Sequence, residues 1–298
     1  MELSISLAGK RMRNPFMNAS GIGGVSASLL RRFYEGGAGA IVTKSCTYFP
    51  REGHDNPVYV KLRAGCINSM GLPNPGYKEV ARELKELRTI GAPIVTSIAP
   101  STSLEADEMV SELDEVSDIF ELNLSCPHSS KLGAEVGSDL ELTEAIVRSI
   151  RRKTNKPLFP KLQPVRNAIT DFVEKLDGLV EGYVIANTAR AMAIDVWASA
   201  PVLSNGFGGL SGAGLHPIVV ALVYDLYEIT RKPIVGVGGV ISWEDAVELM
   251  LAGASAVQIG SALGEMRMDI FREFAEQLAH YLHRQGMKVS EVVGLAHR

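Results

Sequence analysis

The sequence predicts a closed (β/α)8 barrel, and three observations carry this prediction. Short apolar runs alternate with longer helix-like segments along nearly the whole chain. The runs are apolar on both faces, as in parallel strands that helices cover on both sides. Eight such runs occur, each followed by a helical segment, which favours a closed barrel over an open sheet. Because no linker or low-complexity tract interrupts residues 1–298, we expect a single domain.

Each expected element can be placed along the chain. Several strand candidates follow a glycine or an X-Pro step, where helix commonly gives way to strand. The strand candidates are 15–20, 40–44, 93–99, 119–125, 158–162, 182–188, 233–238 and 256–260. The helical candidates are 26–37, 76–90, 103–117, 140–154, 168–180, 216–230, 242–253 and 268–285. A short β-hairpin at about residues 4–12 is expected to cap the bottom of the barrel.

Composition limits the partners that the chain could have. A net charge of −4 gives no basic field for nucleic acid or anionic lipid. No apolar stretch approaches the roughly 18 residues that a membrane span requires, and the N-terminus lacks a signal-peptide pattern. Three cysteines are too few for a disulfide framework or an all-cysteine metal site. We therefore expect a cytoplasmic protein with no metal site, no membrane and no nucleic-acid partner.

Polar residues end several of the apolar strands. Lys44, Lys161, Asn18, Asn123 and Asn187 all stand at the carboxyl end of a strand candidate. In a barrel these ends meet at one face, where active sites are built. A buried charge or amide without partners costs several kcal/mol. The convergence of five such residues predicts a functional site at this face, rather than a set of isolated polar core residues.

The last two strands run into glycine-rich turns, GVGGV (236–240) and QIGSAL (258–263). Such turns let backbone N–H groups approach an anion at a helix N-terminus, and strands seven and eight of a barrel are a common phosphate site. Neither these turns nor GFGGLSG (206–212) match the dinucleotide fingerprint. Lys161 could stabilise a reduced flavin or pair with Glu121 on a neighbouring strand, and Lys44 has the same ambiguity. Flavin mononucleotide (FMN) is therefore a coherent hypothesis.

Cys126 is the candidate catalytic residue. It follows a strand and precedes a proline in the loop SCPHSSKLGAEVGSD (125–139). A free thiol, with a pKa of about 8.5, can act as a base where its surroundings favour the thiolate. Cys46 and Cys66 are expected to be inert small hydrophobic residues. Hydrolysis by a Cys–His pair is an alternative, but it leaves the lysines and the phosphate turns unexplained.

Together these segments resemble the class 1 dihydroorotate dehydrogenases, FMN-dependent barrels of pyrimidine synthesis. The resemblance covers essentially the whole chain, and NSMGLPN with NLSCP is its most specific part. The segments that carry it are NPFMNASG (14–21), VTKSCT (42–47), NSMGLPNPG (68–76), ELNLSCP (121–127), PKLQP (160–164), GFGGLSG (206–212), VGVGGV (235–240) and QIGSAL (258–263).

The resemblance implies a role for individual residues. Cys126 would remove the C5 proton of dihydroorotate while a hydride leaves C6 for FMN. Substrate would contact Lys44, Asn68, Met70, Gly71, Leu72, Asn123, His128, Asn187 and Thr188. FMN would be held by Ala19, Ser20, Lys44, Ser45, Asn123, Lys161, Gly212, Gly238, Gly239, Gly260 and Ser261.

Two positions depart from the common pattern of the family. His128 stands where many members have asparagine, and Thr188 stands where serine is frequent. Both changes are shared with dihydropyrimidine dehydrogenase, so uracil or thymine reduction is the alternative activity. The loop NSMGLPN (68–74) looks like the orotate-binding loop and favours dihydroorotate. A dihydrouridine synthase, another flavin barrel, would need a basic surface for tRNA.

The resemblance leaves the electron acceptor open. TKSCTYFPREG (43–53) resembles the fumarate-using homodimers, whereas GGLSGAGLHP (208–217) looks closer to enzymes that reach NAD through an iron–sulfur and FAD subunit. The chain has no cysteine cluster of its own, so NAD reduction would require that partner. We expect at least a homodimer, with fumarate, quinone or NAD as the final acceptor.

Overall fold

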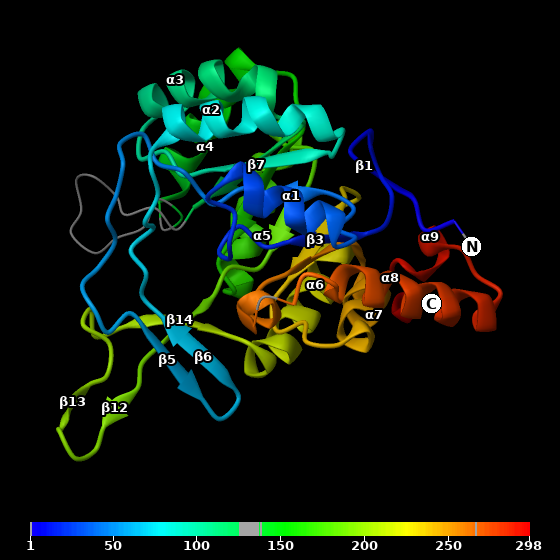
Figure 1. Cartoon of the computed structure of the whole chain (residues 1–298). Coiled ribbons are helices and arrows are strands. Elements are labelled where there is room, and N and C mark those ends of the chain that lie inside the picture. The colour runs from blue at the N-terminus through cyan, green and yellow to red at the C-terminus, as the bar shows by residue number, and fades with distance from the viewer. Residues whose placement is uncertain (1, 125–136, 138, 266) are drawn as a thin grey trace.

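The computed structural model describes residues 2–124, 137, 139–265 and 267–298, without the side chain of residue 265. Its centre is an eight-stranded parallel sheet in the order β3-β16-β15-β10-β9-β8-β7-β4 (Figure 1). The predicted (β/α)8 barrel is thereby confirmed. Each strand lies inside its predicted range, except that β16 begins two residues earlier than expected. The strands are β3 Phe16–Asn18, β4 Ile41–Val42, β7 Ile94–Ile98, β8 Ile119–Asn123, β9 Leu158–Leu162, β10 Tyr183–Ile185, β15 Ile234–Val237 and β16 Ala254–Ile259.

The sheet closes on itself between β3 and β4. Met17 and Ala40 form a parallel bridge there, although the two strands stand at opposite ends of the strand order. The Asn18 side chain completes the junction: its Nδ2 donates to the Val42 carbonyl at 2.7 Å, and its Oδ1 accepts from the Val42 N–H at 2.9 Å. Asn18 is fully buried. One side-chain amide therefore replaces a strand–strand pair of backbone hydrogen bonds.

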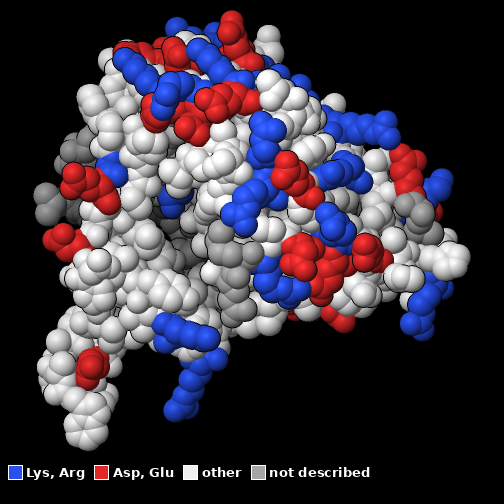
Figure 2. All heavy atoms as spheres, viewed as in Figure 1, with Lys and Arg blue, Asp and Glu red and all other residues white. Residues whose placement is uncertain are grey.

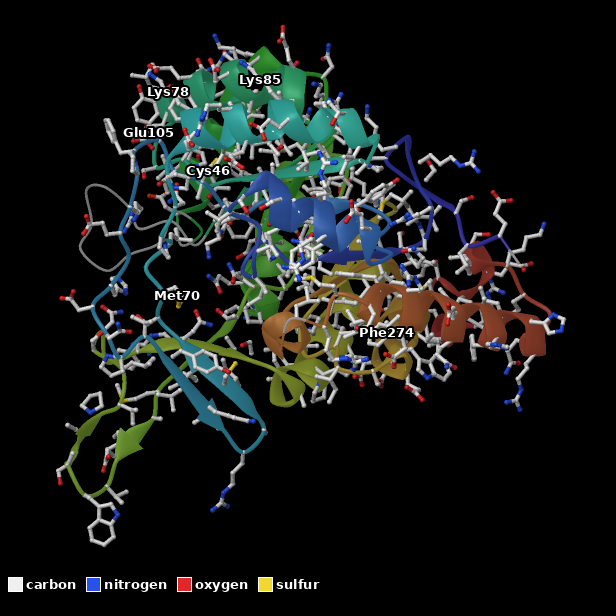
Figure 3. The ribbon with its side chains drawn as sticks, viewed as in Figure 1. Cys46, Met70, Lys78, Lys85, Glu105 and Phe274 are labelled. Carbon is white, nitrogen blue, oxygen red and sulfur yellow. The ribbon has the colours of Figure 1, made fainter. Side chains whose placement is uncertain are left out.

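Helices surround the barrel and cover its outer surface, as the apolar strands require. Phe274 of α8 is labelled in Figure 3. It packs edge-on against Phe16 of β3, with ring centroids 5.9 Å apart. Four helices begin at side-chain N-caps, namely Ser26, Thr102, Asp139 and Ser242. The helices are α1 Ala27–Glu35, α2 Tyr77–Leu87, α3 Ser103–Leu113, α4 Leu140–Lys153, α5 Arg166–Leu176, α6 His216–Ile229, α7 Trp243–Ala252, α8 Ile270–Gln285 and α9 Val289–Val292.

Short 3-10 helices extend several of these elements, and none of the helices in the described ranges is both long and apolar enough to cross a membrane. The two chain ends lie on the same side of the molecule (Figure 1). The 3-10 segments are η1 Arg88–Ile90, η2 Asp114–Val116, η4 Asp177–Leu179, η5 Ala213–Leu215, η6 Ser261–Glu265 and η7 Leu295–His297.

An N-terminal hairpin packs against the inside of the barrel. Strands β1 (Ile5–Leu7) and β2 (Lys10–Met12) pair in antiparallel fashion. Their inward residues Leu7 and Met12 belong to the apolar cluster formed by the barrel's interior side chains. The hairpin therefore closes the end of the barrel where the strands begin, and leaves the opposite end for a site.

Two insertions build a second, antiparallel sheet in the order β11-β14-β6-β5 (Figure 1). One insertion lies between β4 and α2, and the other lies between β10 and α6. This sheet was not predicted from the sequence, because its strands are only three or four residues long and mostly only partly buried. Its strands are β5 Tyr59–Leu62, β6 Gly65–Asn68, β11 Ala189–Ala191 and β14 Gly208–Ser211, and a separate hairpin is formed by β12 Ile194–Asp195 and β13 Ala200–Pro201.

Replacement of Asn18 by alanine tests how the barrel closes. Asn18→Ala leaves the buried N–H and C=O of Val42 without partners, and each unpaired group costs about 1–3 kcal/mol. We expect the free energy of unfolding to fall by about 2–4 kcal/mol in urea denaturation. Asn205→Ala, at an exposed loop position, is the control and should change it little. Equal stability of the two variants would contradict the proposed closure.

Candidate active site

The inside of the barrel changes from apolar to polar toward the carboxyl ends of its strands. Alternate residues of a strand share a face, so Ile119, Glu121 and Asn123 of β8 all point inward. Ile119 belongs to the apolar interior cluster, whereas Glu121 and Asn123 are buried polar residues. On β9, apolar Phe159 is likewise followed by Lys161. The same step occurs on β7 and β16, with Val95 then Ser97 and Ala256 then Gln258.

Glu121 lies at the centre of this polar layer and is completely buried. Its Oε1 accepts a hydrogen bond from Ser97 Oγ at 2.9 Å, and its Oε2 accepts one from Gln258 Nε2 at 2.7 Å. Lys161 Nζ lies 3.7 Å from Glu121 Oε1. The ammonium group also donates to Gln258 Oε1 at 3.0 Å and to Ser20 Oγ at 3.3 Å. The carboxylate is thus hydrogen-bonded on both oxygens beside a cation, which is the condition for tolerating a buried ion pair.

A second lysine adds positive charge to the same region. Lys44 is buried, and its Nζ donates to the Gly21 carbonyl at 3.4 Å. Burial lowers the pKa of the Lys44 ammonium, and the charge of Lys161 lowers it further. Two ammonium groups therefore share the surroundings of one carboxylate. An anion or an electron-rich ring edge bound here would offset the excess positive charge.

A row of amide and hydroxyl groups continues from this charge cluster. Ser45 Oγ lies 2.9 Å from Ser97 Oγ and accepts from Asn123 Nδ2 at 2.9 Å. Asn187 Nδ2 donates to Asn123 Oδ1 at 3.3 Å, and Asn187 Oδ1 accepts from the Thr188 N–H at 2.8 Å. The structure therefore brings together side chains from the ends of β4, β8 and β10. Such a row offers both donors and acceptors to a flat, polar heterocycle.

The antiparallel sheet supplies a second group of predicted residues. Asn68 ends β6, and its Nδ2 lies 3.5 Å from a backbone carbonyl of β14. The chain then passes through Met70, which is partly exposed on the segment before α2 (Figure 3). Gly71 has φ +73°, and a Cβ there would lie 2.8 Å from His54, so only glycine fits. Leu72 also has a positive φ, 55°, which is uncommon for a branched residue and often marks a functional segment.

The glycine-rich turns pack closely around the start of α6. Gly239 has φ +68°, and a Cβ there would lie 2.7 Å from the Gly212 carbonyl oxygen. Gly260 lies between the end of β16 and Ser261, the first residue of η6, and a Cβ on Gly260 would lie 3.5 Å from the Cβ of Ala19. Close backbone packing therefore explains Gly212 and Gly239, whereas Gly260 has room for a side chain. A phosphate site is compatible with these turns but is not required by them.

Two of the three cysteines, Cys46 and Cys66, are described by the structure, and both are buried. Cys126 and His128, the predicted base and its neighbour, lie outside the described residues. Cys46 is fully buried beneath α2, and burial raises the pKa of its thiol to about 12 (Figure 3). Cys66 Sγ lies 3.1 Å from Ser211 Oγ within the antiparallel sheet. Both described thiols thus occupy structural positions, in agreement with the sequence analysis.

Ser97 and Gln258 were not predicted as site residues from the sequence. Both hydrogen-bond Glu121 in the buried group around Glu121 and Lys161. Each lies on the inward face of its strand, two residues beyond an apolar interior residue. That alternation is visible in the sequence and could have identified them. Their partners could not be inferred, since Gln258 and Glu121 are 137 positions apart.

The model of the dihydroorotate dehydrogenase family matches residues 2–282. The chain belongs to this family. It is 43% identical over 302 residues to a protein of Pyrococcus furiosus, which covers 100% of both chains. It is 41% identical to a protein of Methanocaldococcus jannaschii, over 99% of this chain and 98% of that protein. It is 44% identical to a protein of Methanosarcina acetivorans, over 98% of this chain and 95% of that protein. All three are named dihydroorotate dehydrogenase B (NAD(+)), catalytic subunit.

These comparisons confirm the predicted family, class 1 of the dihydroorotate dehydrogenases, and the predicted enzyme class, an oxidoreductase. The family's reaction is the oxidation of dihydroorotate in pyrimidine biosynthesis, as the sequence analysis expected. The name "catalytic subunit" also implies that these relatives work with a partner subunit.

Replacement of Lys44 by methionine tests the electrostatics of the site. The pKa of Lys44 is lowered in the folded state. At pH values between this lowered pKa and the ordinary lysine pKa of about 10.4, the unfolded chain therefore binds more protons than the folded chain. The charged lysine therefore costs stability below this window, and the cost disappears as pH rises through it. We expect Lys44→Met to stabilise the flavin-free protein at neutral pH, with a gain that shrinks toward pH ~10.

Urea denaturation across pH measures this effect. Lys61→Met, on the exposed face of β5, is the matched control and should show no such pH dependence. A Lys44→Met variant that is less stable than the parent protein at every pH would contradict the assigned charge excess.

Proposed function

We propose that this chain is the catalytic subunit of an enzyme that oxidises (S)-dihydroorotate to orotate, with FMN as the hydride acceptor and NAD as the final acceptor through a separate electron-transfer subunit. The observation that carries the proposal is the buried cluster of two lysines and one carboxylate, next to a row of asparagines, in a member of the dihydroorotate dehydrogenase family. The related proteins named for NAD(+) support the choice of final acceptor over fumarate and quinone.

The residues at the mouth of the barrel fit FMN by the chemistry of their donors. Lys161 and Ser20 are buried donors within 3.3 Å of each other, and Lys44 adds a second cation. Cations in this position favour an electron-rich or anionic ring. The turns at Gly238–Gly239 and Gly260–Ser261 follow the last two strands, where a barrel most often binds phosphate. Lys161 and Ser20 would therefore hold the flavin ring, and the glycine turns at Gly238–Gly239 and Gly260–Ser261 would hold its phosphate.

The chain's own residues would divide the remaining work. When bound, FMN supplies the acceptor for the hydride that leaves C6 of dihydroorotate. Cys126 would take the C5 proton, so that loss of the proton and of the hydride leaves a C5–C6 double bond. Asn68, Asn123 and Asn187 would orient the pyrimidine ring through its polar edge, and Lys44 would neutralise the substrate carboxylate.

Anaerobic titration of the purified protein tests the proposed substrate. Dihydroorotate should bleach the flavin absorbance in proportion to the amount added, whereas dihydrouracil should leave it unchanged. Bleaching by dihydrouracil alone would favour the dihydropyrimidine dehydrogenase alternative. A colourless protein that binds no added FMN would contradict both.

Replacement of Cys126 tests the assigned base. Cys126→Ala should retain FMN and lower the rate of substrate-driven bleaching by about 10²-fold or more at neutral pH, because general base catalysis contributes about 10²–10⁴-fold. Cys126→Ser should act only at higher pH, because a hydroxyl is a far weaker acid than a thiol. Unchanged bleaching in Cys126→Ala would show that another group takes the proton.

The β12–β13 hairpin is the part of the described chain that we assign to self-association. Trp197 at its tip is 94% exposed, and Val196 and Ile194 are 76% and 60% exposed. The hairpin projects from the body and is almost free of charged side chains, in contrast to the mixed charges over α2 and α3 (Figure 2). Tryptophan is enriched at the centres of protein interfaces. We propose that a second copy of this chain covers the tip in a homodimer.

Replacement of Trp197 by serine tests this assignment. Trp197→Ser should raise the dissociation constant of the dimer by about tenfold or more, since hot-spot residues contribute 2 kcal/mol or more. Light scattering after size-exclusion chromatography measures the change in mass. Val25→Ser, at an exposed apolar residue on another part of the surface, is the control. A monomeric parent protein, or an unchanged mass in Trp197→Ser, would contradict the assignment.

A further inference from the structure

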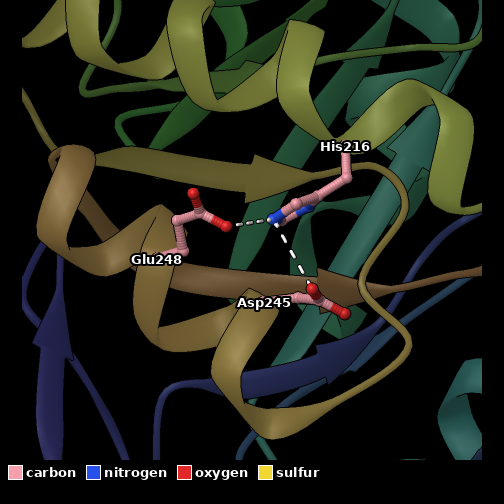
Figure 4. A group of neighbouring side chains, drawn as sticks. All are labelled: His216, Asp245 and Glu248. Carbon is pink, nitrogen blue, oxygen red and sulfur yellow. Dashed lines mark hydrogen bonds and ion pairs between the residues drawn. The ribbon is translucent and has the colours of Figure 1, made fainter.

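His216 lies behind the glycine turns, between one backbone carbonyl and two carboxylates. It is the first residue of α6, and its side chain is 9% exposed. Its Nδ1 lies 3.1 Å from the Gly238 carbonyl oxygen. Its Nε2 lies 3.1 Å from Glu248 Oε2 and 3.8 Å from Asp245 Oδ1, both on α7 (Figure 4). Both ring nitrogens therefore face oxygen atoms that can only accept hydrogen bonds.

A metal cation at Nε2 would suit this arrangement. A neutral imidazole carries one N–H. If that N–H is on Nδ1, where it donates to Gly238, the Nε2 lone pair points at carboxylate oxygens and would be repelled by them. A metal cation between Nε2 and the carboxylates would remove this repulsion.

We propose that His216, Asp245 and Glu248 form a binding site for a divalent transition-metal ion of the zinc type. Their ligand atoms all lie within 4.8 Å of one another. A tetrahedral zinc ion with bonds of about 2.0–2.1 Å separates its ligand atoms by roughly 3.3 Å. The distances of 3.1 and 3.8 Å from Nε2 to the two carboxylates lie on either side of that value. Small side-chain adjustments would therefore bring all three atoms onto one ion.

Backbone contacts already orient two of the three ligands. The bond from Nδ1–H to the Gly238 carbonyl fixes the tautomer that leaves Nε2 free to bind a metal, as is usual for metal-ligating histidines. Asp245 uses Oδ2 to accept from the N–H groups of Ile241 and Ser242, at 2.9 and 2.8 Å, which turns Oδ1 toward His216. Glu248 is one turn further along α7 and more exposed, so it completes the site from the solvent side.

A metal here would join the start of α6 to α7. His216 begins α6, the carboxylates come from the first two turns of α7, and Gly238 directly follows β15, the strand between these helices. The bound ion would hold α7 against the start of α6 and support the turn at Gly238. None of the three ligands is among the proposed substrate and FMN residues, although His216 contacts the carbonyl of Gly238, which is one of them. The test measures zinc binding itself and so does not depend on the assigned reaction.

Zinc titration of the purified holoenzyme, after chelation and removal of the chelator, tests the proposal. Isothermal titration calorimetry should show zinc binding to the parent protein, and the melting temperature should rise with zinc. Glu248→Gln removes one ligand of nearly the same shape and should weaken binding at this site by about tenfold or more. Glu244→Gln, an exposed residue at the start of α7 with the same change in charge, is the matched control and should bind like the parent.

The variants also separate this site from binding by cysteine thiols, which Glu248→Gln leaves intact. His216→Asn should lose the same binding event as Glu248→Gln. Equal zinc affinity in the parent and in Glu248→Gln would overturn the proposal. Failure of the parent protein to bind zinc would also overturn it.

Discussion

The ion pair between Lys161 and Glu121 is the interaction on which the proposed site depends. Both side chains are almost completely buried, and their charged atoms lie 3.7 Å apart inside the barrel. Unpaired, either charge would be very costly in this environment, so each must keep its partner. Ser97, Gln258 and Ser20 supply the hydrogen bonds that the pair still needs. The lysine is thereby held near the barrel mouth in a fixed position.

The barrel explains how such a pair can exist. Its lower half is filled by apolar side chains and closed by the N-terminal hairpin, which excludes water from below. Its upper half is polar, and the two insertions carry the antiparallel sheet beside this end. Lys44 adds a second charge whose protonated form is disfavoured in the absence of an anion. The flavin and the substrate would thus complete an electrostatic arrangement that the chain alone leaves with excess positive charge.

Much of the fold was predictable from the sequence, because it follows from local patterns. Apolar runs and helical periodicity identified every strand of the barrel and the helix after it. The antiparallel sheet was not predicted, because short strands such as Gly208–Ser211 gain their stability from distant partners and not from their own apolar residues. The α9 helix was not predicted, because four residues are too few to show a helical period.

The site was predictable in part. Lys44, Lys161, Asn123 and Asn187 could be assigned to one face, since parallel strands all end on the same side. Their partners could not be assigned, because pairing depends on side-chain directions across the barrel. The cluster of His216, Asp245 and Glu248 could not be predicted for the same reason. Asp245 and Glu248 lie 29 and 32 positions after His216, and no local sequence motif joins them to it. The role of Cys126 still rests on the sequence and on the family.

The reduction potential of bound FMN in Lys161→Met is the most direct test of the account. If the Lys161 charge lies beside the flavin, the variant should bind FMN more weakly, and its potential should be more negative than that of the parent protein. The double variant Lys161→Met, Glu121→Gln removes the orphaned carboxylate and separates this effect from loss of folding. An unchanged FMN content and potential in both variants would mean that the buried pair is structural only, and would contradict the central claim.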